Sequence, residues 1–185
     1  MMKSIILVFC LMVGLAASGQ NDIDYQNKRL IGNLKKNGIS DFAQLHEIKV
    51  DQKSLPDIQG KYFSVESGSG GSVVKYIYVG RVNSCRIGGC CNTSNIAVDV
   101  ESEYFDYFIL FDSAKTVRLV DVYNYEATHG YEITAKGWLK QFIGFSGKDT
   151  LLVNKDVDGI SGATISVFAI TEDVQVKTKL LKSVN

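Results

Sequence analysis

An almost unbroken run of aromatic and apolar residues covers Tyr104 to Phe111, and it limits the fold more than any other stretch of the chain. A short run of this composition is typical of a buried β-strand. Residues 115–123 follow a short polar turn, and Val117, Leu119 and Val122 lie there between charged residues. Because so few residues separate the two segments, we expect them to pair as an antiparallel hairpin.

Other periodic segments predict one further strand and several helices. Residues 72–82 alternate as a strand does, whereas four segments have helical features. These four are residues 22–37, residues 41–48 with Asp41 as N-cap, residues 137–142, and residues 164–174, where Ile165, Phe168, Ala169 and Ile170 form an apolar stripe. The elements together predict an α+β fold, in which helices pack on a mostly antiparallel sheet.

Size and composition indicate one domain. The chain has 185 residues and is 45% hydrophobic, which is enough to build a single core. Its 20 basic and 20 acidic residues give no net charge, so we expect no nucleic-acid partner. We divide the chain into residues 1–19, an N-terminal helical segment and connection at 20–71, and the main domain at 72–185. The Gly/Ser segment at 67–72 is interpreted as a hairpin loop rather than an interdomain linker.

The N-terminus resembles an export signal. Lys3 precedes an apolar stretch from Ser4 to Ala17, and small residues at positions 17 and 19 suit a signal peptidase. Cleavage there would leave Gln20 as the first mature residue. An uncleaved anchor is the alternative, but the stretch is shorter than the roughly 20 residues that a membrane-spanning helix needs. We therefore expect an exported protein, in the periplasm or on the outer face of the inner membrane.

Small and hydroxyl residues gather before the last predicted helix, in the sequence Asp-Gly-Ile-Ser-Gly-Ala-Thr-Ile-Ser at 158–166. Ser161, Gly162 and Ala163 would let a ligand approach the backbone, and free amides at a helix N-terminus favour an anion such as phosphate. Thr164 adds a hydroxyl at the same point. An ordinary helix capped by Ser161 or Asp158 explains the same residues, so the pattern alone leaves both interpretations open.

This segment resembles the flavinylation motif of the FMN-binding domain family, found in extracytoplasmic subunits of Rnf and sodium-pumping NADH:quinone reductase complexes. The matching residues are Asp158, Ser161, Gly162, Ala163 and Thr164. In that family a flavin transferase moves FMN from FAD onto the motif threonine as a phosphoester. The resemblance therefore implies covalent FMN at Thr164, with Ser166 nearby, and makes residues 72–185 the FMN-binding domain.

The resemblance extends upstream to a loop and a short helix. Trp138 to Phe142 corresponds to a Gln-Phe helix of the family, and residues 126–130 correspond to its Glu-containing loop. The usual Glu-Thr-Pro-Gly of that loop is here Glu-Ala-Thr-His-Gly. Glu126, His129 and Gly130 are the candidate flavin contacts, and the imidazole of His129 could donate a hydrogen bond or a proton near neutral pH. A surface turn is the alternative for this loop.

Three cysteines are expected in the mature chain: Cys85, Cys90 and Cys91. A disulfide between Cys85 and one of the other two is the simplest interpretation in an exported protein. A redox-active dithiol that exchanges electrons with the flavin is an alternative, so the three are candidate redox thiols. The spacing does not fit a zinc site, and we expect no metal.

Taken with the resemblance, the sequence predicts an exported, membrane-associated flavoprotein in electron transport. Its expected partners are a flavin transferase for maturation and a membrane redox complex or another electron-transfer protein. Two alternatives stay open: an extracytoplasmic flavin-dependent reductase with its own substrate, and a binding module that has the fold without flavin. The sequence does not decide whether the protein is itself an enzyme.

Overall fold

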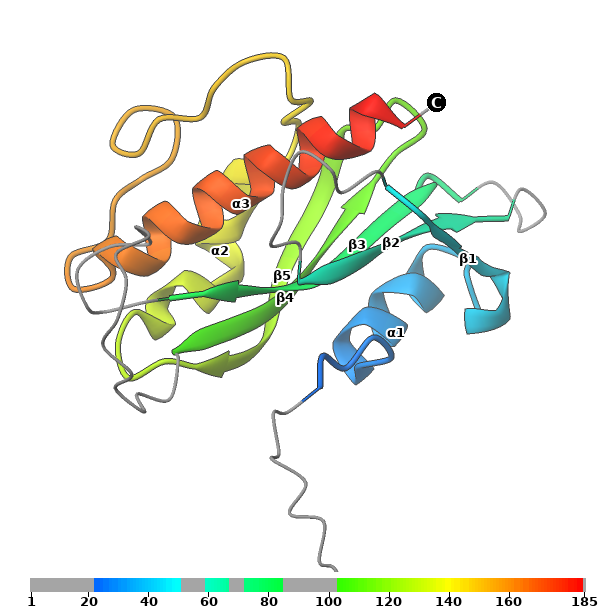
Figure 1. The fold of residues 1–185 in the computed structure, drawn as a ribbon, viewed down its shortest axis with the longest axis horizontal. Coiled ribbons are helices and arrows are strands. Elements are labelled where there is room, and N and C mark those ends of the chain that lie inside the picture. Colours follow the sequence, from blue (N-terminus) through cyan, green and yellow to red (C-terminus); the bar gives the residue numbers. More distant parts are fainter. Residues whose placement is uncertain (1–21, 51–58, 67–71, 85–102, 185) are drawn as a thin grey trace, which may run out of the picture.

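A computed structural model describes residues 22–50, 59–66, 72–84 and 103–184. There, five strands follow one another in chain order in one antiparallel sheet: β1 (Leu45–Ile48), β2 (Gly60–Val65), β3 (Tyr76–Asn83), β4 (Tyr104–Phe111) and β5 (Val117–Glu126). The helices are α1 (Lys28–Lys36), α2 (Lys136–Leu139) and α3 (Thr164–Ser183), with 3₁₀ turns η1 (Phe42–Gln44), η3 (Tyr131–Thr134) and η4 (Lys140–Phe142) (Figure 1). The predicted α+β fold is confirmed.

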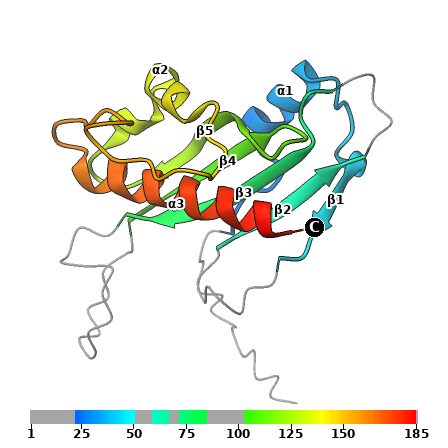
Figure 2. The same ribbon diagram turned by 90° about the horizontal axis from the view of Figure 1, so that it is seen from above.

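Strand β4 contributes side chains to both faces of the sheet. Phe105 and Tyr107 pack in a cluster with residues of α3 and α2, whereas Phe108 and Leu110 pack with residues of α1. Successive side chains of a strand point to opposite faces, and Figure 2 shows α3 and α1 on opposite sides of the sheet. Because both faces are covered, this strand needs almost no polar residues.

The β4–β5 hairpin forms as predicted. Leu110 lies opposite Leu119, and the pairing ends with Tyr104 opposite Glu126. Strand β5 therefore continues beyond its predicted end at residue 123. Strand β3 is also confirmed, although it begins at Tyr76 rather than at residue 72.

The N-terminal elements differ from the prediction in three places, one of which is β2, since no strand was predicted for residues 60–65. Helix α1 begins at Lys28 rather than residue 22, because the side chain of Asn27 caps it by accepting a hydrogen bond from Leu30 N at 2.8 Å. Asp41 caps a helical turn as expected, but this turn ends at Gln44. Residues 45–48 form β1 instead, so the predicted helix over 41–48 is wrong there. Pairing with β2 decided the outcome, since so short a segment has no clear period of its own.

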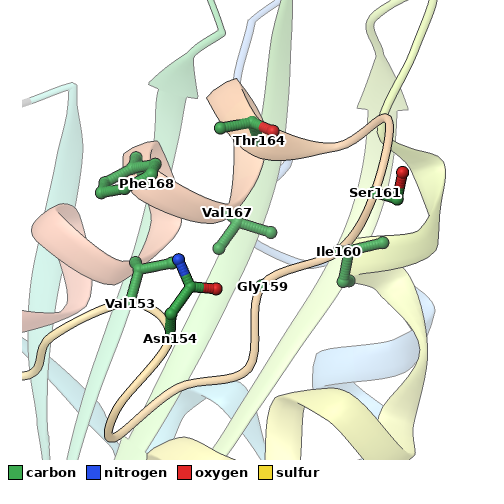
Figure 3. A pocket seen from close by; sticks show the side chains of 8 residues that line it. All are labelled: Val153, Asn154, Gly159, Ile160, Ser161, Thr164, Val167 and Phe168. Atoms are coloured by element: carbon green, nitrogen blue, oxygen red, sulfur yellow. The ribbon is translucent and has the colours of Figure 1, made fainter.

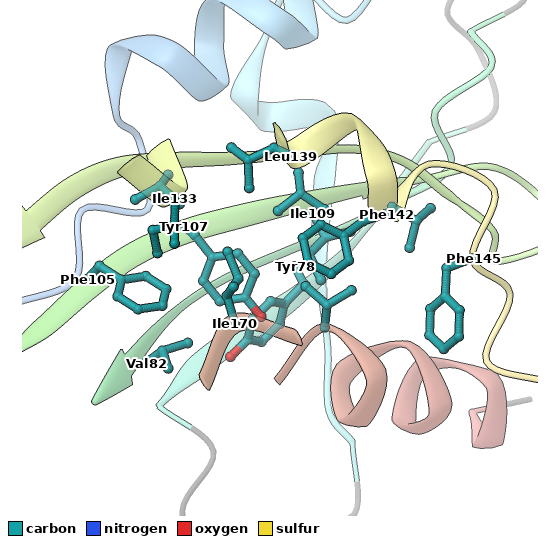
Figure 4. Packing of buried hydrophobic residues seen from close by; sticks show 14 of the residues in the cluster. Tyr78, Val82, Phe105, Tyr107, Ile109, Ile133, Leu139, Phe142, Phe145 and Ile170 are labelled. Carbon is teal, nitrogen blue, oxygen red and sulfur yellow. The ribbon is translucent and has the colours of Figure 1, made fainter. Parts of the chain in front are cut away.

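Helix α3 continues well beyond the predicted residues 164–174. Its buried side carries Ser166, Val167, Ile170, Thr171, Val174, Lys177, Thr178 and Leu181. Ile170 is buried as expected, but Ile165 is 46% and Phe168 52% exposed, so the predicted apolar stripe is wrong for these two. The α3 side chains meet the sheet in the cluster drawn in Figure 4.

Several predicted features lie outside the described residues, including the export signal at 1–19 and the cysteines at 85, 90 and 91. Residues 67–71 also lie outside, but they connect β2 and β3, which are antiparallel neighbours in the sheet. Among the helices of the described ranges, none has the length and apolar character needed to cross a membrane.

Candidate functional site

The motif residues form a tight turn that leads into α3. Ala163 N donates to Ile160 O at 3.1 Å, which closes the turn. Gly162 has φ +82°, a conformation that side chains with a Cβ atom rarely adopt. Ala163 is buried, whereas Thr164 is exposed as the first residue of the helix. The turn therefore presents the threonine hydroxyl at the protein surface.

Thr164 lies between two pockets and lines both. The first pocket, here called the Asn154 pocket, has a volume of about 280 Å³ and is shown in Figure 3. It is lined by Val153, Asn154, Gly159, Ile160, Ser161, Thr164, Val167 and Phe168. The second, the His129 pocket, has a volume of about 220 Å³ and is lined by Ser84, Glu103, His129, Gly162, Ala163, Thr164, Ile165 and Ser166.

Side chains from α2 and η4 hold the start of the motif in place. Asp158 N donates to Gln141 Oε1 at 2.8 Å, and the indole Nε1 of Trp138 donates to Asp158 O at 2.9 Å. Gln141 Nε2 also donates to Trp138 O at 3.1 Å. Asp158 itself has an exposed side chain. Its backbone is what fixes the loop, so the Gln-Phe segment predicted from the sequence has a positioning role.

The side chain of Asn154 lies close to the motif backbone at Gly159, in the Asn154 pocket. Its φ is +68°, and its N–H donates to Val157 O at 2.8 Å in a tight turn. A Cβ atom on Gly159 would lie 2.3 Å from Asn154 Oδ1. A side chain at position 159 would therefore displace the Asn154 amide from the motif backbone.

A chain of hydroxyl groups lies beneath the second pocket. Ser166 Oγ is 3.1 Å from Ser84 Oγ and 2.9 Å from the Tyr125 hydroxyl, which in turn donates to His129 O at 2.5 Å. A carbonyl group can only accept, so the single Tyr125 proton goes to His129, and the Ser166 proton goes to Tyr125. Burial raises the pKa of Tyr125 above its ordinary value, which keeps this donor protonated. The chain ties the β5–η3 loop to the first turn of α3.

The predicted loop contacts fall into different positions. His129 lines the second pocket, and Gly130, with φ +90°, packs so closely that an added Cβ would lie 2.6 Å from Ser166 Oγ. Glu126 is exposed at the end of β5 and lines neither pocket. Glu103 lines the second pocket and accepts a hydrogen bond from Thr128 N at 3.0 Å.

The N-terminus of α3 carries no capping side chain. Ala163 occupies the N-cap position and makes no side-chain hydrogen bond to the helix. Neither Ser161 nor Asp158 therefore acts as the cap, and the capped-helix interpretation does not hold. The first amides of a helix carry a partial positive charge, so this end is electrostatically suited to phosphate.

Sequence reasoning missed several residues of this site: Ser84, Glu103, Tyr125 and Asn154. Ser84 and Glu103 come from segments distant in sequence, whereas Tyr125 directly precedes the predicted loop and Asn154 lies four residues before Asp158, but no motif contained any of them. Ser84 and Glu103 also mark the two ends of the segment that contains the candidate thiols. The backbone N–H of Ser84 donates to Glu103 O at 2.7 Å. These two pocket residues flank segment 85–102, which contains the three cysteines and lies outside the described residues. In the described ranges, no group of three or more His, Cys, Asp or Glu side chains could hold a metal ion.

Residues 104–177 match the FMN-binding domain family. The matched segment begins with β4 and ends within α3, so it includes the hairpin, Gln141 and the turn that presents Thr164. No curated protein and no solved structure matches the chain. The family match supports an FMN-binding domain in this part of the chain, and thus a flavoprotein.

Proposed function

From the family match at residues 104–177, we propose that this protein carries FMN as a phosphoester on Thr164 and transfers electrons outside the cytoplasm. The observation that carries the proposal is the position of Thr164. Its side chain is exposed at the uncapped start of α3 and lines both pockets. A ligand attached there can extend into either pocket.

Neighbouring hydroxyl groups are less suited to attachment. Ser166 is 2% exposed, and its oxygen is engaged with Ser84 and Tyr125. Ser161 is exposed but lines one pocket rather than both. Thr164 combines exposure with a position beside the helix amides, where the charge on a phosphate is stabilised.

The surrounding residues have separate roles in holding the cofactor. The first amides of α3 would hold the phosphate, and Gly162 would leave its approach open. Phe168 and Ile165, both about half exposed on the two sides of Thr164, offer apolar surface to the isoalloxazine ring. Gln141 and Trp138 keep the preceding loop in place through Asp158.

A bound flavin can accept one electron or two, so it can link a two-electron donor to one-electron carriers. The protein supplies position and electrostatics. Export and covalent attachment support each other, because a dissociated cofactor outside the cytoplasm would be diluted and not readily replaced. We propose a membrane redox complex or another electron-transfer protein as partner, and a flavin transferase for maturation.

Intact mass spectrometry tests the attachment. The full chain co-produced with a flavin transferase is expected to gain one FMN-sized increment, and Thr164→Val is expected to lose it. Thr150→Val is the matched control, since it makes the same change at an exposed threonine outside the motif and both pockets, and it is expected to keep the increment. An increment that persists in Thr164→Val, or its absence from the wild type, would refute the proposal.

A further inference from the structure

A row of aromatic rings runs into the core from a position beside the His129 pocket, where Tyr125 contacts the lining residue Ser166. In order, the rings belong to Tyr131, Tyr125, Phe105, Tyr107, Tyr78 and Tyr62, and successive ring centroids are 5.6, 5.8, 6.3, 5.7 and 4.8 Å apart. Figure 4 shows Phe105, Tyr107 and Tyr78 following one another across the sheet. We call this set the aromatic row. Contacts of this kind stabilise a core, but the two ends of the row differ in their chemistry.

The outer end of the row lies at the candidate site. Tyr131 is 64% exposed, so a solute can reach its ring. The Tyr125 hydroxyl is 2.9 Å from Ser166 Oγ, and Ser166 lines the His129 pocket together with Thr164. An oxidant generated near Thr164 would therefore meet this end first.

The inner part of the row contains a phenol hydrogen-bonded to a base. The Tyr107 hydroxyl donates to Asp173 Oδ2 at 2.5 Å, while Asp173 Oδ1 lies 3.0 Å from Lys177 Nζ. Tyr125 and Tyr62 instead donate to backbone carbonyl groups, which cannot take up a proton. Burial raises the pKa of Asp173, although Lys177 and Tyr107 oppose this, and the shift makes the carboxylate a stronger proton acceptor.

The proton acceptor beside each tyrosine decides which phenol of the row is most stable after it loses an electron. A phenol that loses one electron becomes a strong acid, and a buried cation without a proton acceptor is costly. At Tyr107 the proton can move to Asp173 as the electron leaves, so the phenol becomes a neutral radical, and the positive charge that the cluster gains is carried by Lys177, whose carboxylate partner is neutralised. Tyr107 is therefore the residue of the aromatic row on which we expect the radical to be most stable.

We propose that the aromatic row moves oxidising equivalents from the Thr164 pockets to Tyr107, where Asp173 takes up the phenolic proton. The Tyr107 O–H bond breaks, a new O–H bond forms on Asp173, and one electron passes outward to an oxygen-centred radical, which takes a proton from water. The products are a neutral tyrosyl radical, a protonated carboxyl group, the reduced and protonated oxidant, and the hydroxide left from the water. The row would thereby draw one-electron damage away from the site.

The inference rests on the proposed function only for the source of the oxidant, because a reduced flavin exposed to dioxygen can generate such radicals. Its test needs no flavin. Full chain produced without a flavin transferase is treated with azidyl radicals, after its thiols are alkylated and in a Trp138→Phe background, so that cysteine and tryptophan do not compete. Radicals trapped by freezing are then measured by electron paramagnetic resonance.

The parent protein is expected to give a long-lived tyrosyl signal that changes in D₂O, since the radical oxygen accepts a hydrogen bond from the proton on Asp173. Tyr107→Phe is expected to lose this signal while keeping the ring. Phe105→Leu, which leaves the Tyr107–Asp173 contact in place, is expected to slow the appearance of the signal.

Tyr123→Phe is the matched control, because this ring stacks on Phe108 in the second core cluster and its buried hydroxyl has no hydrogen-bond partner in the described structure. It is expected to leave the signal unchanged. A signal of equal yield and lifetime in Tyr107→Phe, or an equal loss in Tyr123→Phe, would overturn the proposal. Folding of each variant is checked by circular dichroism. Attachment of FMN to Thr164 is tested separately, by intact mass spectrometry.

Discussion

Arg81 and Asp106 form a buried ion pair directly across strands β3 and β4. Arg81 Nε and Nη2 donate to the two carboxylate oxygens at 2.7 and 3.0 Å, and Asn124 Nδ2 adds a third bond at 3.1 Å. The guanidinium carbon also lies 3.7 Å from the centre of the Tyr104 ring. The side chains of the pair are 7% and 3% exposed, so water screens the pair very little.

Removal of either partner should therefore be costly. Breaking a buried pair leaves one charge without compensation and costs roughly 3–5 kcal/mol. We expect Asp106→Asn to fall near the low end, about 3 kcal/mol, because the amide oxygen can still accept one hydrogen bond from Arg81. For a chain of this size, this corresponds to a decrease in Tm of roughly 6–12 °C. The double variant Arg81→Met/Asp106→Asn should cost less than either single change, since no buried charge remains.

Urea unfolding with an unchanged slope measures these free energies. Glu47→Gln is the matched control, because it breaks a pair with Lys61 in which both side chains are more than 40% exposed. It should alter stability far less, since water and salt screen such pairs. If Asp106→Asn behaves like Glu47→Gln, or if the double variant costs as much as both single changes together, the argument from burial is wrong.

Three further predictions concern the site and the core. Gly130→Ala should lower stability by about 1–2 kcal/mol because of its backbone conformation, and it should also slow FMN loading because the new side chain displaces Ser166. Gly144→Ala, at a residue with a similar φ and open space around it, should lower stability without slowing loading. Urea unfolding measures the stability, and intact mass measures the loading. Because burial raises the pKa of Asp173 above its ordinary value of 3.8, the folded protein binds the carboxyl proton more tightly than the unfolded chain does. The stability of the wild type relative to Asp173→Asn should therefore fall as the pH rises through the raised pKa. A relative stability that increases with pH in urea titrations would contradict this prediction. Alkylation with and without reductant should count fewer than three free thiols among residues 85–91 in exported protein, and three free thiols would exclude a disulfide.

Much of the candidate site could be read from the sequence because it is local. The segment 158–166 contains the small residues, the hydroxyl and the helix start, and these lie together through chain connectivity alone. The structure adds their supports, such as Gln141 and Ser84, which reach the motif through tertiary contacts. Glu126 shows the limit of a motif, since its place in the loop is close in sequence to His129 but its side chain lines neither pocket.

Local sequence patterns were sufficient to predict β3, β4 and β5, the α+β class and the position of Thr164 at a helix start, because strand and helix periods and small-residue turns depend on nearby residues. Tertiary structure decided the rest. Residues 45–48 became a strand because β2 offered a partner, and Ile165 and Phe168 stayed exposed because the sheet meets another side of α3. The contact between Tyr107 and Asp173 joins residues far apart in the chain. Such contacts depend on how the elements pack, and no local pattern encodes that packing.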